Sequence, residues 1–229
     1  MEFGVIIIFL IFMMVLLRIL VGSSKKQIEA IAKDEALDEL AEKYPVNIDM
    51  CKEYLKMLKN ETVTIEEDKN ATNSLYIAIS NKIMIADVKN SYTRIQTIAH
   101  ECLHSIQDRK LLLFNFIYSN IYILYFIIIS ILKLCHLLSH EMVFLSILII
   151  GGCVYYFIRS YLENDAMIKA RFLAKAYMEN KKISSQDEID NIVHHFDRLN
   201  DVGIKSVNYA LLCNVFMGIL IFCAICIIR

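Results

Sequence analysis

Four long runs of apolar residues constrain the fold of this chain more than any other feature of its sequence. They span residues 3–22, 111–132, 142–158 and 206–228. A helix rises about 1.5 Å per residue, so each run is long enough to cross a hydrocarbon core of roughly 30 Å, the third only just. The runs therefore predict an integral membrane protein that is mainly α-helical, with four transmembrane helices in a lipid bilayer.

The first run suits either a retained membrane anchor or a cleaved signal peptide. Only Glu2 precedes its apolar residues, and no Ala-x-Ala cleavage site follows them. A signal peptide has a positively charged start and such a site, so a retained anchor fits better. Arg18 interrupts the run one turn before its end, where a long side chain reaches the polar interface.

Lysine and arginine residues predict the orientation of the chain in the membrane. Thirteen lie in residues 23–110 and eight in residues 159–205, but only one lies between the second and third runs and one follows the fourth. Cytoplasmic loops carry the excess of positive charge. We therefore expect a multi-pass protein with residues 23–110 and 159–205 in the cytoplasm and both termini outside.

The total charge excludes one class of partner. The chain has 24 basic and 25 acidic residues and a net charge of −1. Proteins that bind nucleic acid carry a strongly basic surface, so nucleic acid is not an expected partner. Nothing in the sequence indicates the oligomeric state.

The two polar segments have the periodicities of short helices and strands. Residues 23–42 predict an amphipathic helix that Pro45 ends, and residues 51–59 a second helix. Residues 75–79 and 83–86 alternate in polarity and predict a strand pair or one bent strand. Residues 92–109 return to helical spacing, with a capping box at Thr93 and Gln96. Residues 163–179 predict a further helix, and Ser185 with Glu188 begins another toward Asn200.

Residues 100–104 read His-Glu-Cys-Leu-His, an HExxH motif. Residues i and i+4 of a helix share one face, so His100 and His104 can bind one Zn²⁺, while Glu101 can reach a water molecule beside the ion. For six histidines and fourteen glutamates in 229 residues, a chance motif is expected at roughly 1%. The alternative is a pair of histidines on an ordinary surface helix. The extended residues before the motif favour a peptidase whose edge strand holds an extended substrate.

A catalytic zinc site needs a third protein ligand and one open position. Glu163 lies four residues beyond Arg159, where the third run ends, and His104 lies seven residues before the second run begins. The second and third runs form a hairpin that returns the chain to the same membrane face, so Glu163 is the predicted third ligand. Asp165 is the reserve ligand; it can otherwise orient a ligand histidine or pair with Lys169 at i+4.

These residues resemble the motifs of the YugP-like bacterial neutral zinc metallopeptidases. The resemblance rests on His100, Glu101, His104, Ile106 and Gln107, then a two-span hairpin, then Glu163, Asp165 and Ala166. The layout covers nearly the whole chain and is more distantly similar to the CAAX-prenyl-protease and HtpX-type membrane gluzincins. Cys102-Leu103 replaces the Val-Gly pair usual in the family. The resemblance implies a bacterial plasma membrane, one zinc per chain, and a small zincin-like α+β catalytic domain.

The implied activity is hydrolysis of peptide bonds in membrane or membrane-proximal proteins at the cytoplasmic face. Zinc polarises the scissile carbonyl and lowers the pKa of water, and Glu101 takes the proton and passes it to the leaving amine. His194 and His195 are candidates for stabilising the oxyanion, with a solvated helix face as the alternative. A pseudoprotease or membrane scaffold would tolerate the same topology but has no need of Glu101. A transporter is disfavoured because the runs hold almost no ionisable residues.

Overall fold

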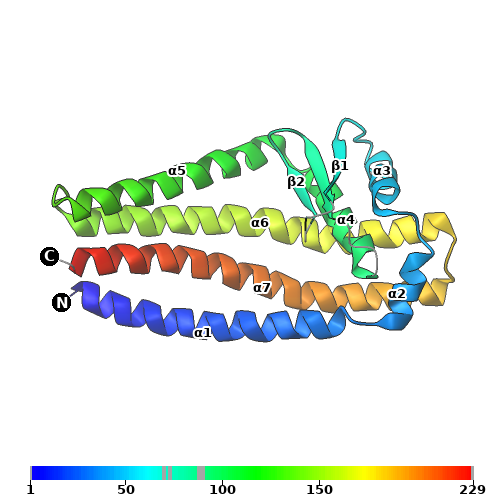
Figure 1. Ribbon diagram of the computed structural model, residues 1–229, viewed down its shortest axis with the longest axis horizontal. Helices are drawn as coiled ribbons and strands as arrows, with labels where there is room; N and C mark the ends of the chain where they lie inside the picture. The colour runs from blue at the N-terminus through cyan, green and yellow to red at the C-terminus, as the bar shows by residue number, and fades with distance from the viewer. Residues whose placement is uncertain (1, 69–70, 72–73, 87–90, 228–229) are drawn as a thin grey trace. The chain divides into compact units, whose positions relative to one another are not determined.

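A computed structural model describes the chain except for residues 1, 69–70, 72–73, 87–90 and 228–229 (Figure 1). The chain divides into two compact units, each built from segments that are distant in sequence. We call the first the helical unit; it contains Met1–Lys25, Phe114–Tyr161 and Lys205–Arg229. We call the second the α+β unit; it contains Lys26–Leu113 and Leu162–Ile204.

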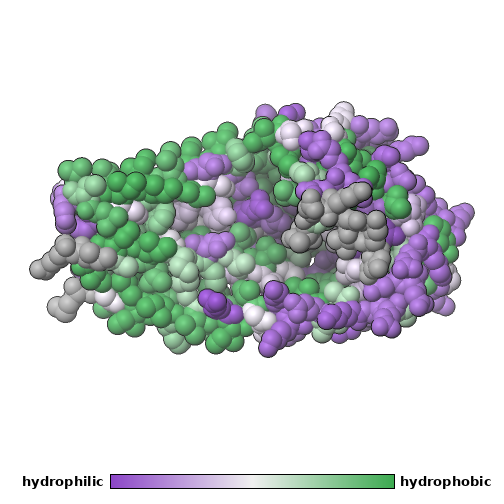
Figure 2. All heavy atoms as spheres, viewed as in Figure 1, coloured by the Kyte–Doolittle hydropathy of each residue, from purple (hydrophilic) through white to green (hydrophobic). Residues whose placement is uncertain are grey.

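Four helices in the described part of the chain are long and apolar enough to cross a membrane. They are α1 (Glu2–Ile31), α5 (Arg109–Leu134), α6 (Glu141–Lys181) and α7 (Gln186–Ile227). Within the helical unit their segments run side by side and share a core that includes Leu10, Ile129, Leu148 and Phe222 (Figure 1). Their outer surfaces remain apolar and exposed (Figure 2). Exposed apolar surface of this extent indicates a membrane protein.

The predicted apolar runs lie inside these helices, and α6 and α7 extend far beyond them. The last predicted residue of the fourth run, Ile228, lies outside the described residues. The helix predicted over residues 163–179 is part of α6, and the helix predicted to begin at Ser185 continues to Ile227. The predicted helices are therefore present, but each is joined to a predicted apolar run in one continuous helix. The chain's one proline, Pro45, lies elsewhere, and an alanine-rich sequence has no local reason to leave the helix.

The helix start predicted at Ser185 and Glu188 is confirmed, and the two residues form a capping box. The Ser185 backbone N–H donates to Glu188 Oε2 at 2.7 Å, and the Glu188 backbone N–H donates to Ser185 Oγ at 3.3 Å. This reciprocal pair satisfies two donors that a helix start leaves without partners inside the helix.

The single amphipathic helix predicted over residues 23–42 is instead two helices, because α1 ends at Ile31 and α2 spans Glu35–Glu42. Asp34 caps α2: its Oδ1 accepts from the Leu37 N–H at 3.1 Å. Aspartate is strongly favoured at an N-cap, and here this local preference overrides the continuous apolar periodicity. The predicted second helix exists as α3 (Asn47–Met57).

The α+β unit contains a three-stranded sheet of order β1-β3-β2, formed by β1 (Thr64–Asp68), β2 (Leu75–Ile77) and β3 (Lys82–Ala86). The predicted strand pair is confirmed, because β2 and β3 are antiparallel. β1 was not predicted; its sequence Thr-Ile-Glu-Glu-Asp lacks apolar alternation, and it pairs in parallel with β3. β2 is therefore an edge strand of the described sheet.

The motif helix α4 spans Thr93–His104 and contacts β2 and β3. Its apolar face joins a core that includes Met50, Tyr54 and Phe196. The predicted capping box is wrong, because Gln96 instead donates to the Asn200 side chain. Gln96 lies on the buried face of α4, where an amide without a partner is costly, so a buried polar contact replaces the cap. The predicted end near residue 109 is also wrong, since α4 ends at His104.

Candidate metal centre

α4 brings His100 and His104 together on one face, as the i, i+4 spacing predicts. Their Nε2 atoms lie 3.0 Å apart and their rings meet edge to face. His104 is buried and His100 half-buried. Both imidazoles therefore present a ring nitrogen to the same point in space.

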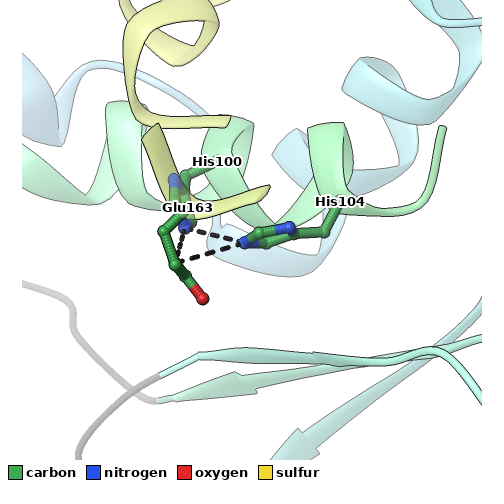
Figure 3. A group of neighbouring side chains, drawn as sticks. All are labelled: His100, His104 and Glu163. Atoms are coloured by element: carbon green, nitrogen blue, oxygen red, sulfur yellow. Dashed lines mark hydrogen bonds and ion pairs between the residues drawn. The ribbon is translucent and has the colours of Figure 1, made fainter. Parts of the chain in front are cut away.

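α6 supplies a carboxylate to that point. Glu163 Oε2 lies 3.6 Å from His100 Nε2 and 3.7 Å from His104 Nε2 (Figure 3). Neighbouring ligands of a tetrahedral zinc ion with bonds of 2.0–2.1 Å are roughly 3.3–3.4 Å apart. The three observed separations of 3.0, 3.6 and 3.7 Å bracket that value. Among the described histidine, cysteine, aspartate and glutamate residues, these three form the group that is close enough to hold a metal ion.

The charge of Glu163 favours a cation between these ligands. Burial lowers the pKa of His104, but its hydrogen bond and Coulomb interaction with Glu163 outweigh burial and leave the pKa raised. A proton and a metal ion compete for the same nitrogen lone pair. The two-histidine, one-carboxylate set thus has the donor chemistry of a catalytic zinc site.

Gln107, just beyond α4, orients His104. Its Oε1 lies 2.8 Å from His104 Nδ1, and its Nε2 donates to Leu162 O at 2.8 Å and to Asp165 Oδ2 at 3.2 Å. The two acceptors fix the amide orientation, so Oε1 faces the imidazole and Nδ1 is the donor. The unprotonated Nε2 of neutral His104 therefore faces His100 and Glu163.

The described hydrogen bonds and ion pairs of Asp165 are to Gln107 and Lys169 rather than to His100 or His104. Asp165 accepts from Gln107, and its Oδ1 pairs with Lys169 Nζ at 2.6 Å. Burial raises the pKa of Asp165, but the hydrogen bonds from Lys169 and Gln107 outweigh it and lower the pKa. Both predicted alternatives are present in part: the ion pair forms, and the carboxylate influences His104 through Gln107.

Glu101 is buried beside the sheet rather than in the ligand group. Its Oε2 accepts from the Tyr76 backbone N–H of β2 at 2.7 Å, and 8% of the residue is exposed. Burial raises the pKa of Glu101 despite the opposing effect of His100 and His104. A carboxylate with a raised pKa is a stronger base, as a proton carrier requires. No sequence pattern predicts this contact with Tyr76, because every residue except proline has a backbone N–H.

His194 and His195 make other contacts. His195 Nδ1 lies 3.0 Å from Asn191 O, and its Nε2 lies 3.7 Å from Asp34 Oδ2. His194 is exposed and meets His195 edge to face. The described contacts of His195 join α7 to the start of α2. Neither ring belongs to the group His100, His104 and Glu163.

Cys102, inside the motif, points into the core. Its Sγ lies 3.5 Å from Cys51 Sγ of α3, and both residues are buried. The side chain at this position therefore packs α4 against α3 in the core.

Comparison of the chain with protein-family models, with curated proteins and with solved structures found no match.

The zinc content of the detergent-purified protein tests the ligand group. We expect about one zinc per chain by elemental analysis, lost in His104→Ala and in Glu163→Ala, because each change removes one of three ligands. Glu179→Ala, an exposed change on the same helix α6, is the control and should keep the metal. A wild-type protein without metal, or variants with undiminished zinc, would contradict the assignment.

Gln107→Leu should weaken zinc binding by about 10–100-fold, the usual effect of losing a group that orients a ligand histidine. The measurement is competition with a chromophoric chelator. Gln186→Leu, at the exposed start of α7, is the control and should bind zinc as the wild type does. Equal affinity in Gln107→Leu and Gln186→Leu would show that His104 needs no such support.

Proposed function

We propose that this chain is an integral membrane zinc metalloendopeptidase that cleaves membrane or membrane-proximal proteins at the cytoplasmic face. The observation that carries the proposal is the convergence of His100, His104 and Glu163, with Glu101 of the same motif buried beside an edge strand. The resemblance of the motif residues to the YugP-like zinc metallopeptidases supports the same reaction. Bound zinc would polarise the scissile carbonyl and lower the pKa of the attacking water.

The chain's own residues then account for the movement of the proton. Glu101 takes a proton from water as the water oxygen bonds to the carbonyl carbon. The carbon–nitrogen bond breaks, and Glu101 returns the proton to the leaving nitrogen. The raised pKa of Glu101 suits both steps, because burial favours the protonated form between them. Gln107 keeps His104 in the tautomer that leaves its Nε2 available.

The proposed orientation rests on charge and is consistent with the arrangement of the helical unit. Within that unit, the start of α1, the end of α7 and the turn between α5 and α6 lie at one end (Figure 1). The lysine-rich and arginine-rich segments 23–110 and 159–205 are joined to the other ends of the spans. The positive-inside rule assigns those segments to the cytoplasm.

Glu101→Gln tests the reaction. We expect peptide hydrolysis to fall by about 10²–10⁴-fold, the range for losing a general base, because glutamine cannot take the proton. Zinc content should be unchanged, since Glu101 is not a ligand. Glu179→Gln, exposed on α6, is the control. Activity that survives in Glu101→Gln would remove the base assignment, and a wild-type protein that binds zinc without hydrolysis would favour a pseudoprotease or membrane scaffold.

The proposed substrate class follows from the short sequence distance between the ligands and the apolar runs. His104 precedes the second run by seven residues, and Glu163 follows Arg159 by four. We expect a peptide attached to a membrane anchor to be cleaved faster than the same peptide free in solution, because the bilayer holds it close to the site. The measurement is cleavage of both in proteoliposomes, and equal rates would exclude a membrane-proximal preference.

A further inference from the structure

The edge of β2 that faces away from β3 offers a backbone donor beside the candidate site. In an antiparallel pair, alternate residues turn their N–H groups toward the partner strand and away from it. Tyr76 is paired with Ile83 of β3, yet its N–H points instead to Glu101. Tyr76 is therefore the residue of β2 whose amide a further strand would use.

Glu101 already holds this amide. The Tyr76 N–H and Glu101 Oε2 are 2.7 Å apart, a length typical of a hydrogen bond to a charged acceptor. Such bonds are stronger than those between neutral backbone groups. An extended peptide that adds a strand to β2 presents a carbonyl oxygen to the same N–H. The peptide carbonyl and the Glu101 carboxylate therefore require the same hydrogen-bond donor, the Tyr76 N–H.

We propose that a substrate strand and Glu101 compete for the Tyr76 N–H, which makes this backbone amide a determinant of substrate specificity. The proposal rests on the proposed peptidase function. A segment long enough to pair with β2 replaces the Tyr76 bond to Glu101 with its own strand bonds and leaves the carboxylate to accept the proton from water. A peptide too short to pair with β2 leaves Glu101 bound to Tyr76. The site thereby selects unfolded, extended protein segments over minimal peptides.

Tyr76→Pro and Tyr76→Ala separate the amide from the side chain. Both variants lose the phenol ring and its hydrogen bond to Asn81 Oδ1, but only proline lacks the N–H. Proline is tolerated on an edge strand where the N–H makes no bond within the sheet, which is the situation of Tyr76. Zinc content and far-ultraviolet circular dichroism should be equal in the two variants, which verifies that both are folded.

Two substrates then give opposite results. For a blocked dipeptide amide, we expect kcat/KM of Tyr76→Pro to exceed that of Tyr76→Ala by about tenfold, the effect of one hydrogen bond to a charged group. For a quenched fluorescent peptide long enough to pair with β2, we expect KM to be higher in Tyr76→Pro by a similar factor. Slower turnover of both substrates by Tyr76→Pro, or equal behaviour of the two variants, overturns the competition.

Binding of an uncleavable extended peptide tests the same competition without catalysis. Glu101→Ala removes the competing carboxylate and should bind the peptide about tenfold more tightly than the wild type. The gain should vanish in Glu101→Ala combined with Tyr76→Pro, because the freed amide is then absent. No gain in Glu101→Ala overturns the competition. A wild-type protein that cleaves neither substrate refutes the peptidase function itself, so the two failures are distinguishable.

Discussion

The side chain of Gln107 makes the contact on which the candidate metal centre depends. The motif histidines belong to α4 and the third candidate ligand belongs to α6, more than fifty residues later. Gln107 uses both ends of one amide to join these elements, accepting from His104 and donating to Leu162 O and Asp165. A ligand group assembled from distant segments needs such a support, because ligand directions must be held within a narrow range.

The parts of this arrangement that the sequence predicts are those governed by local periodicity. The apolar runs and the i, i+4 spacing of the histidines follow from helix geometry. Glu163 was predicted as the third ligand because a hairpin of two helices returns the chain to the side of His104. Long-range contacts had no such local signature. β1 is acidic and half-exposed, and it forms only because β3 provides its partner. Gln96 appeared to be a capping residue but is drawn into a buried bond with Asn200, so tertiary contacts overrode the local motif.

The buried polar residues of α4 are costly to the fold and therefore informative about function. Glu101 and His104 are each less than one-tenth exposed, on a helix whose buried apolar residues belong to the core. A buried carboxylate is destabilising unless it is paired or hydrogen-bonded. Glu101 accepts a hydrogen bond from the Tyr76 amide, and burial raises its pKa. Buried ionisable groups whose pKa is shifted in this way are concentrated at functional sites.

An ion at this site would also stabilise the α+β unit. The unit consists of Lys26–Leu113 and Leu162–Ile204, which are separated in sequence by the α5–α6 hairpin. Two ligands belong to the first segment and Glu163 belongs to the second. Because the unfolded chain does not hold these three side chains together, the free energy of metal binding adds to the stability of the folded unit. The three side chains of the candidate metal centre would thus hold the two segments together, so stability and metal occupancy would depend on one set of residues.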